Sequence, residues 1–453
     1  MIKYFCSTIM TFVLFLSDFA LPQNAYDAVH LSDNEFGFGT RAMGMGGAFT
    51  GLADDYSAIY WNPAGLGQIS NPVIYSELTH TRFSNDALYG GSLTHYSRDY
   101  TRLGSFGYVM PIPTERGSLV FAFGYNRIRD FDRNLMFSGM SSLSNDLDFS
   151  INDSVYTFDE NVFRMEEVDS EGGIHEWTIG GAMELSPIFT LGVSVALQRG
   201  TEDYRLHFLQ IDADGSYNEY PGDFHSYSVR NLLQSEYTAL SLKAGGLIQI
   251  DRNLRMGGTI TLPSLISVDE VHSFDDLLLF DDDYEDTYES SGQFKYHIRT
   301  PFVFDGGLSI NSKWLTVSAS ARYRDWSQIR FEVDRNDLAD EDYSEFLDEN
   351  AVIRQDYRPT VEYRVGGEMA VIPKVKLRGG YTIIPSNFQG TAGISDREFL
   401  TTGVSIQVDR YISLDASMMT GRWQEKSSDN YTPEGTDEDI SLTRFTVGFS
   451  YRF

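Results

Sequence analysis

Apolar and polar residues alternate with a period of two along most of the chain from about residue 72 onward. In residues 443–453, "TRFTVGFSYRF", aromatic or aliphatic side chains occupy every second position, and small or basic side chains lie between them. Successive side chains of a β-strand point to opposite faces, so this period predicts strands with one apolar face. The same pattern recurs at residues 189–198, 315–323 and 412–418.

The lengths of the links between these segments favour a barrel. Short links, such as Ser186-Pro187 and residues 251–253, alternate with long ones, such as residues 130–173 and 335–355. Outer-membrane barrels show this alternation, because their periplasmic turns are short and their outer loops are long. A soluble β-sandwich also has strands with one apolar face, and the pattern alone leaves it open. We expect both termini on the periplasmic side and about 14 strands, near residues 72–82, 101–112, 118–129, 174–186, 188–208, 236–250, 254–270, 294–311, 314–333, 356–372, 375–385, 397–408, 411–424 and 441–453.

Composition narrows the possible functions. The chain has 453 residues and a net charge of −30, with 65 acidic against 35 basic side chains. Such a surface repels phosphate backbones, so we expect no nucleic-acid partner. Beyond the N-terminus no apolar run of about 18 residues occurs, which disfavours a helical membrane protein. The 27 Tyr, 31 Phe and 40 Gly residues suit strands and turns.

The N-terminus predicts export. Lys3 precedes an apolar segment, residues 9–16, which is too short to span a bilayer and is followed by polar residues. We interpret residues 1–25 as a secretory signal peptide with an undetermined cleavage site. The alternative, a membrane anchor, is disfavoured by the length of the segment. The single cysteine, Cys6, lies inside this signal, so the mature protein has neither disulfide nor thiol nucleophile.

Residues 269–289 contain ten acidic side chains and no Lys or Arg. We interpret this stretch as a solvated outer loop. Divalent-cation binding by its carboxylates is the alternative, but no loop has EF-hand spacing, and we predict no metal.

The sequence contains only incomplete matches to catalytic and cofactor-binding motifs. Residues 37–42 match a dinucleotide fingerprint but lack the preceding buried strand, and His175-Glu176 lacks the second His of a zinc motif, because Ile179 stands there. We predict no cofactor and no enzyme activity.

Residues 26–71, between the signal peptide and the first strand, have an unusual composition. They are rich in glycine and alanine, carry few charges, and include aromatic residues such as Trp61. Such a segment is too apolar for a solvated tail, and a 14-strand barrel has a lumen that needs contents. The predicted fold is therefore all-β: a closed antiparallel transmembrane β-barrel over residues 72–453, with residues 26–71 as a hatch, or plug, in its lumen.

Several motifs resemble the FadL/TodX family of outer-membrane transporters of hydrophobic compounds. Asn62-Pro63-Ala64 resembles the family's Asn-Pro-Ala hatch motif. Residues 176–200, the Trp-Ser-Gln strand at residues 324–333, and residues 363–388 are similar to barrel segments of the family. The resemblance covers nearly the whole mature chain. It implies a hatch inside a 14-strand barrel of an outer membrane.

By this resemblance, we expect passive uptake of long-chain fatty acids or other hydrophobic compounds. The ligand would pass a hatch gated by Trp61, Asn62, Pro63 and Ala64, and leave sideways where a strand kinks. Gly124 is a candidate for that kink; a small residue that makes room in the lumen is the alternative. The expected partners are hydrophobic small molecules, membrane lipid and lipopolysaccharide, and the expected state is a monomer. No ligand-binding residue is assigned.

Two other functions stay open. Related PorV-type proteins share the barrel and the hatch and shuttle exported proteins in bacterial secretion. An open porin for polar solutes is the other alternative, which a plug disfavours.

Overall fold

The computed structural model describes residues 24–33, 36–141, 143–151, 154–333, 341–389 and 395–453. The predicted signal peptide therefore lies almost wholly outside the described residues. Eighteen strand segments form a single sheet, and every pairing in it is antiparallel. The first strand, β1 (Val73–Tyr89), pairs with β2 (Ser92–Ile112) on one edge and with the last, β20 (Thr436–Arg452), on the other, so the sheet closes on itself.

Four barrel strands are each interrupted once, which makes eighteen segments out of fourteen strands. The interrupted strands are β3–β4, β10–β11, β12–β13 and β14–β15. The predicted closed barrel of about 14 strands is confirmed. The other segments of the sheet are β3 (Leu119–Asp130), β4 (Arg133–Ser141), β7 (Val162–Ser186), β8 (Phe189–Ile211), β9 (Phe224–Gln249), β10 (Leu254–Thr261), β11 (Leu265–Phe280), β12 (Glu285–Arg299), β13 (Val303–Asn311), β14 (Leu315–Asp325), β15 (Arg330–Glu332), β16 (Pro359–Ile372), β17 (Val375–Ile384), β18 (Arg397–Gln407) and β19 (Ile412–Ser427).

The barrel is apolar outside and polar inside, the reverse of a soluble core. On β20, Phe445 and Val447 are exposed on the outer surface, whereas Thr446 and Gly448 between them are buried. Closure leaves the sheet without the two free edge strands of an open sheet, which the hydrocarbon of a bilayer would not tolerate. An apolar exterior on a closed, even-stranded barrel is the surface of an outer-membrane protein. No helix in the described part of the chain is long and apolar enough to cross a membrane.

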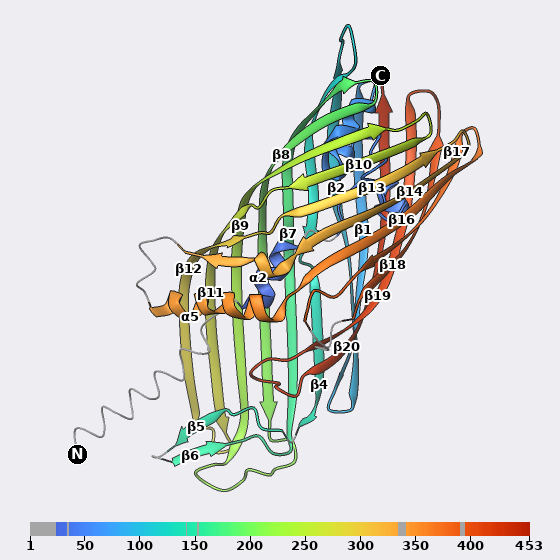
Figure 1. Ribbon diagram of the computed structural model, residues 1–453. Helices are drawn as coiled ribbons and strands as arrows, with labels where there is room; N and C mark the ends of the chain where they lie inside the picture. The colour runs from blue at the N-terminus through green and yellow to red at the C-terminus, as the bar shows by residue number, and fades with distance from the viewer. Residues whose placement is uncertain (1–23, 34–35, 142, 152–153, 334–340, 390–394) are drawn as a thin grey trace.

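One end of the barrel has short turns and the other carries the longer connections (Figure 1). Strands β7, β8 and β9 have 25, 23 and 26 residues, whereas about 10 residues suffice to cross a bilayer. They therefore continue beyond the membrane. The acidic stretch predicted as a loop is also largely strand: β11 and β12 pair from Leu265↔Arg299 to Leu279↔Glu285, and only a tight turn at residues 281–284 joins them. The acidic side chains that suggested a loop stand on a strand hairpin instead.

The N-terminal segment enters the barrel. Its helices are short, and α2 begins at an Asn24 capping box. The C-terminus lies at the short-turn end, where the Phe453 amide donates to the Pro72 carbonyl at 3.0 Å. The first described residues do not share that end, because the Ala25 amide donates to Glu349 Oε2 of the β15–β16 connection at 2.8 Å. The N-terminus itself, which we expect on the periplasmic side, lies outside the described residues. The elements outside the sheet are α2 (Ala25–Ser32), α3 (Thr40–Gly44), α4 (Ala58–Trp61), η1 (Pro63–Gln68), η2 (Trp326–Gln328), α5 (Glu341–Asp356) and the hairpin β5 (Asp148–Ile151)–β6 (Ser154–Thr157).

Candidate functional site

Asn62 forms the corner at which the plug meets the barrel wall. Its side chain is fully buried and uses both ends of the amide. Nδ2 donates to the Thr50 carbonyl within the plug at 2.9 Å and to the Gly246 carbonyl of β9 at 3.1 Å. Oδ1 accepts from the Ala64 amide at 3.1 Å and so caps η1. Pro63 occupies the first position of η1, where the missing N–H is not needed.

Glycines in the wall make room for this corner. A side-chain Cβ at Gly245 of β9 would lie 2.2 Å from Asn62 Oδ1, and one at Gly192 of β8 would lie 2.3 Å from the Ala64 amide nitrogen. Gly192 and Gly245 are partners across the two strands. No larger residue fits at either position while the corner stays in place. The corner therefore depends on two opposed glycines.

The same relationship recurs around the barrel. On β17, a Cβ at Gly380 would lie 2.4 Å from the Gly46 amide nitrogen. Wall hydroxyls then bind the plug carbonyls: Thr382 Oγ1 donates to Gly46 at 2.6 Å, and Ser309 Oγ donates to Gly51 at 2.8 Å. The wall glycines on which the plug rests, here called the glycine ring, are Gly107, Gly124, Gly180, Gly192, Gly245, Gly257, Gly307, Gly366, Gly380, Gly403 and Gly448.

Trp61 and Gly124 also lie at this plug–wall contact. The Trp61 indole donates to the Phe38 carbonyl at 2.8 Å, and the Arg364 guanidinium lies 5.3 Å from the Trp61 ring. Gly124 is in regular register within β3, opposite Gly107, and a Cβ there would lie 2.0 Å from Tyr56 Oη of the plug. The strand itself is interrupted further along, between β3 and β4. A kink at Gly124 stays a prediction.

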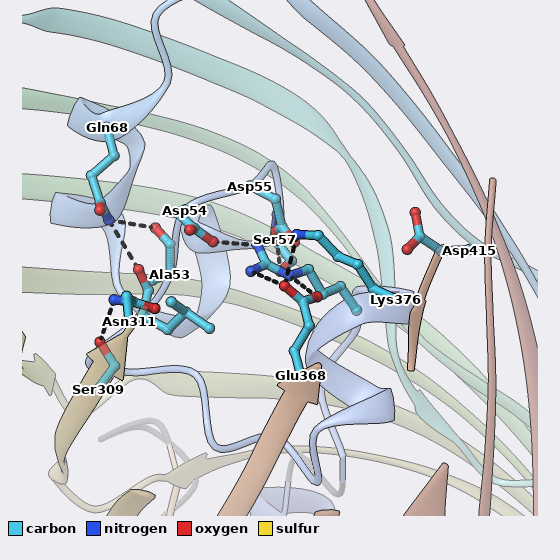
Figure 2. A network of polar contacts seen from close by, with 12 residues as sticks. Ala53, Asp54, Asp55, Ser57, Gln68, Ser309, Asn311, Glu368, Lys376 and Asp415 are labelled. Atoms are coloured by element: carbon cyan, nitrogen blue, oxygen red, sulfur yellow. Dashed lines mark hydrogen bonds and ion pairs between the residues drawn. The ribbon is translucent and has the colours of Figure 1, made fainter. Parts of the chain in front are cut away.

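An ionic cluster holds the plug to the other side of the wall. Arg41 of α3 makes two hydrogen bonds to Glu368 of β16, at 2.9 and 3.1 Å, and pairs with Asp54 of the plug. Arg378 Nε of β17 donates to Glu368 at 2.7 Å, and its Nη1 donates to Asp415 of β19 at 2.6 Å. Figure 2 shows Glu368 reaching from its strand toward Asp54 and the plug. A buried carboxylate that loses such partners leaves uncompensated charge, so this cluster fixes the plug position.

A second ionic contact holds the C-terminal end of α2. Asp33 pairs with Arg324 of β14 and with Arg397 of β18, each at 3.0 Å, and Arg324 also donates to the Ser32 carbonyl at 3.2 Å. Burial raises the pKa of Asp33, but the two arginines outweigh burial and hold that pKa below its ordinary value. The carboxylate is therefore ionised and fastens α2 to two strands.

Two adjoining cavities lie between the plug and the wall. The first has a volume of about 50 Å³ and is lined by apolar side chains, including Leu31 of α2, Ile174 and Ile266, and by polar ones, including Gln198 and Arg324. The second also has a volume of about 50 Å³, and most of its lining is polar or charged, including Lys243, Arg322 and Glu176. They lie next to each other, because Gln198, Ser241, Thr261, Val303 and Arg324 line both.

Lys243 marks the cationic end of this double cavity, where Arg322, Arg324 and the carboxyl group of Glu176 also line the wall. Lys243 Nζ donates to the Tyr60 carbonyl at 2.5 Å and lies 4.4 Å from the centre of the Tyr60 ring. Among the described residues, no carboxylate pairs with Lys243 within 4.0 Å. Arg324 Nε is buried and has no hydrogen-bond partner. Within the described chain, no group of three or more His, Cys, Asp or Glu side chains is arranged to hold a metal.

Solved structures with the same fold were found, although no protein-family model and no curated protein matches the sequence. The Pseudomonas putida toluene transporter TodX aligns over 92% of this chain and 99% of its own, with a TM-score of 0.59 at 14% identity. A Pseudomonas aeruginosa FadL homologue aligns over 91% and 98%, with a TM-score of 0.58 at 14% identity. The Ralstonia pickettii toluene transporter TbuX aligns over 92% and 99%, with a TM-score of 0.52 at 14% identity. The chain has the FadL/TodX fold. These similar structures are described as transporters, not as enzymes.

Within this fold, the sequence-predicted residues Trp61, Asn62, Pro63 and Ala64 come together at the plug–wall contact. Gly124 lies at the same contact, under Tyr56. Sequence reasoning missed the glycine ring and the pairing of Arg41 with Glu368. The available signal was a glycine near the middle of many strands, since glycine inside a strand often marks a close backbone approach.

Proposed function

We propose that this protein is an outer-membrane channel for passive uptake of long-chain fatty acids or other hydrophobic compounds. The observation that carries the proposal is the double cavity between plug and wall, apolar at Leu31 and Ile266 and cationic at Lys243. Ligand sites combine apolar walls with a few placed polar groups, and this cavity offers both kinds of side chain. In this proposal an apolar chain lies against Leu31, Ile174 and Ile266.

The head group that suits the cationic end is a carboxylate. Lys243 has no carboxylate partner within 4.0 Å among the described residues, and Arg324 Nε is a buried donor without an acceptor. A ligand carboxylate placed there forms charge-assisted hydrogen bonds, which are roughly twice as strong as neutral ones. A fatty acid therefore satisfies both ends of the cavity, whereas a hydrocarbon satisfies only the apolar end.

The plug acts as the gate in this proposal. Its backbone lies against the glycine ring, so no ligand passes while Asn62 and Gly245 remain in contact. A ligand in the double cavity touches Ile59 and Tyr60 of α4, directly before the Asn62 corner. Displacement of α4 moves the corner off its two glycines and opens the lumen. The same closed plug disfavours an open porin for polar solutes.

The proposal can be tested by measuring both the binding and the uptake of a fatty acid by the protein in liposomes. Purified full-length protein in liposomes receives radiolabelled palmitate or its neutral analogue hexadecanol. We expect uptake of both, tighter binding of palmitate, and a loss of that preference in Lys243→Gln. Equal affinity of the wild type for both probes overturns the carboxylate assignment. Failure to take up either probe by a correctly folded barrel overturns the channel, and a stable complex with an exported protein then supports the shuttle function.

A further inference from the structure

The turns at one end of the barrel carry basic side chains. Short turns join β2 to β3, β9 to β10, β13 to β14, β16 to β17 and β18 to β19 at the end where the C-terminus lies (Figure 1). Periplasmic turns of outer-membrane barrels are short, so this is the periplasmic end. Each of these turns exposes one Lys or Arg side chain. Together they form a set that we call the basic girdle: Arg116, Arg252, Lys313, Lys374 and Arg410.

Most carboxylates in the same turns are occupied by the backbone. Asp251 accepts from two amides of its own turn at 2.7 and 2.9 Å, and Asp409 does the same at 2.7 and 2.8 Å. Glu115 is the remaining acidic residue of these turns and is exposed. The turn carboxylates therefore shape the turns and leave the basic girdle largely uncompensated.

The girdle side chains differ from other exposed basic residues of the barrel. Toward the opposite end, Arg82 pairs with Asp99 at 2.7 Å and Arg230 pairs with Asp275 at 2.9 Å. Among the described residues, no girdle side chain lies within 4.0 Å of a carboxylate. The girdle thus presents positive charge that the protein itself does not neutralise.

The lipid-facing surface of the barrel extends up to the girdle. Ile250 and Val408 are 52% and 46% exposed and continue the outward faces of β9 and β18. Arg252 and Arg410 follow them two positions later. Trp314, directly after the girdle residue of the β13–β14 turn, is 61% exposed. Tryptophan is enriched where membrane meets water, so the girdle lies at the level of the lipid headgroups.

The composition of the chain does not account for this arrangement. The net charge is −30, and acidic side chains outnumber basic ones 65 to 35. A random distribution of these residues would make the short turns acidic as well. Instead, basic residues outnumber acidic ones there, while residues 269–289 at the other end carry ten acidic side chains and no Lys or Arg. The two ends of the barrel therefore suit different surroundings.

We propose that the basic girdle binds the anionic headgroups of phospholipids in the periplasmic leaflet of the outer membrane. Phosphate groups form charge-assisted hydrogen bonds with Lys and Arg. Long basic side chains lay their apolar stems on the lipid-facing surface and place their charged groups among the phosphates. Lipopolysaccharide is confined to the other leaflet, so its phosphates do not reach this end. The inference is independent of the proposed function, because it concerns the lipid around the barrel and not the transported solute.

Quenching of Trp314 fluorescence by brominated lipid measures which lipid borders the girdle. Full-length protein with Trp177→Phe lacks the other strongly exposed indole, and the remaining tryptophans are buried. This parent protein is reconstituted in bilayers that mix phosphatidylglycerol with phosphatidylcholine, with bromine on one lipid or on the other. The girdle variant adds Arg116→Gln, Arg252→Gln, Lys313→Gln, Lys374→Gln and Arg410→Gln.

A matched control removes the same number of exposed basic side chains away from the girdle. Each of these side chains pairs with a carboxylate of the barrel, so it has no charge to offer a lipid. The substitutions are Arg82→Gln, Arg205→Gln, Arg230→Gln, Lys295→Gln and Arg422→Gln. Heat-shifted gel migration reports whether each barrel is intact.

We expect Trp314 of the parent protein to prefer phosphatidylglycerol by roughly fivefold at low salt, and less at high salt. The control should keep this preference, and the girdle variant should lose it. Equal quenching by the two lipids in the parent protein overturns the proposal, and it is the result expected if the girdle serves a soluble periplasmic partner instead. A preference that survives in the girdle variant, or that the control loses equally, also overturns it. If the girdle variant does not fold, Lys313→Gln alone replaces it, and an unchanged preference at the adjacent Trp314 then overturns the proposal.

Discussion

The Asn62 side chain of the plug donates to the Gly246 carbonyl of the barrel wall at 3.1 Å, while its carbonyl oxygen fits over the bare Cα of Gly245. One amide therefore connects the plug to a strand and caps the helix that follows. Because the side chain is fully buried, water does not replace these bonds when they are lost. Asn62 is therefore a polar anchor of the plug–wall contact, beside the Arg41–Glu368 ion pair.

Asn62→Ala and Pro63→Ala should leave the barrel folded and change the passage of a hydrophobic ligand. The barrel is stabilised by its closed ladder, whereas Asn62→Ala leaves buried carbonyls unpaired, at about 1–3 kcal/mol of plug docking. Heat-shifted gel migration checks the barrel, and liposome uptake of palmitate checks the gate. Normal uptake by the folded double variant would reduce the motif to a turn without a gating role.

Gly245→Leu should displace the plug. A Cβ there would lie 2.2 Å from Asn62 Oδ1, which is too close for two non-bonded atoms. Either the strand or the plug corner must therefore move. The matched control is Gly306→Leu, since a Cβ at Gly306 meets nothing within 4 Å. We expect rapid hydrogen exchange of the plug amides in the first variant only. Equal protection of the plug in both variants would contradict a tight seat on the glycine ring.

Glu368→Gln should loosen the side of the plug that carries α3. The substitution leaves Arg41 and Arg378 with one carboxylate partner each, Asp54 and Asp415. Removal of a partner from a buried ion pair costs about 3–5 kcal/mol. Limited proteolysis within the plug measures the loosening. The control is Asp99→Asn, which breaks an exposed ion pair with Arg82 on the outer surface. The protease should cleave the plug of this variant no faster than that of the wild type.

Acid should release α2 through Asp33. Its pKa is held below the ordinary value by Arg324 and Arg397, so the docked state binds fewer protons than the undocked state. The stabilisation is present above the ordinary Asp range, about pH 4, and is lost as pH falls below it. Hydrogen exchange of residues 25–32 should rise on acidification in the wild type. In Asp33→Asn it should be high at neutral pH and insensitive to acid; a wild-type acid response in that variant would assign the effect to another group.

A tag inserted at Asp281–Asp283 should be labelled on intact cells. The turn lies at the end of the barrel that carries the longer connections, and β11–β12 extend it away from the membrane. The barrel should assemble normally, because the turn lies beyond the paired strands and contacts β9 only through Asp281. Labelling only after the outer membrane is permeabilised would mean that the topology is inverted.

The barrel could be predicted from the sequence. A period of two fixes which side chains share a face, and fourteen such segments with alternating link lengths leave few alternatives to an antiparallel closed sheet. The sequence also predicted that Asn62-Pro63-Ala64 belongs to a plug. The N-terminal segment that contains this motif is too rich in aromatic residues to be a solvated tail. The strand lengths escaped sequence reasoning, because the acidic residues of β11–β12 obscured the alternating apolar face that Val268, Phe274 and Leu278 form.

The plug–wall contact is visible only in the folded molecule. Gly192 and Gly245 are far apart in sequence, and the pairing of β8 with β9 places both under one plug corner. Arg41 finds Glu368 across more than 300 positions of chain, which no local pattern encodes. Periodicity is local and readable, whereas contacts between the plug and the wall depend on barrel closure.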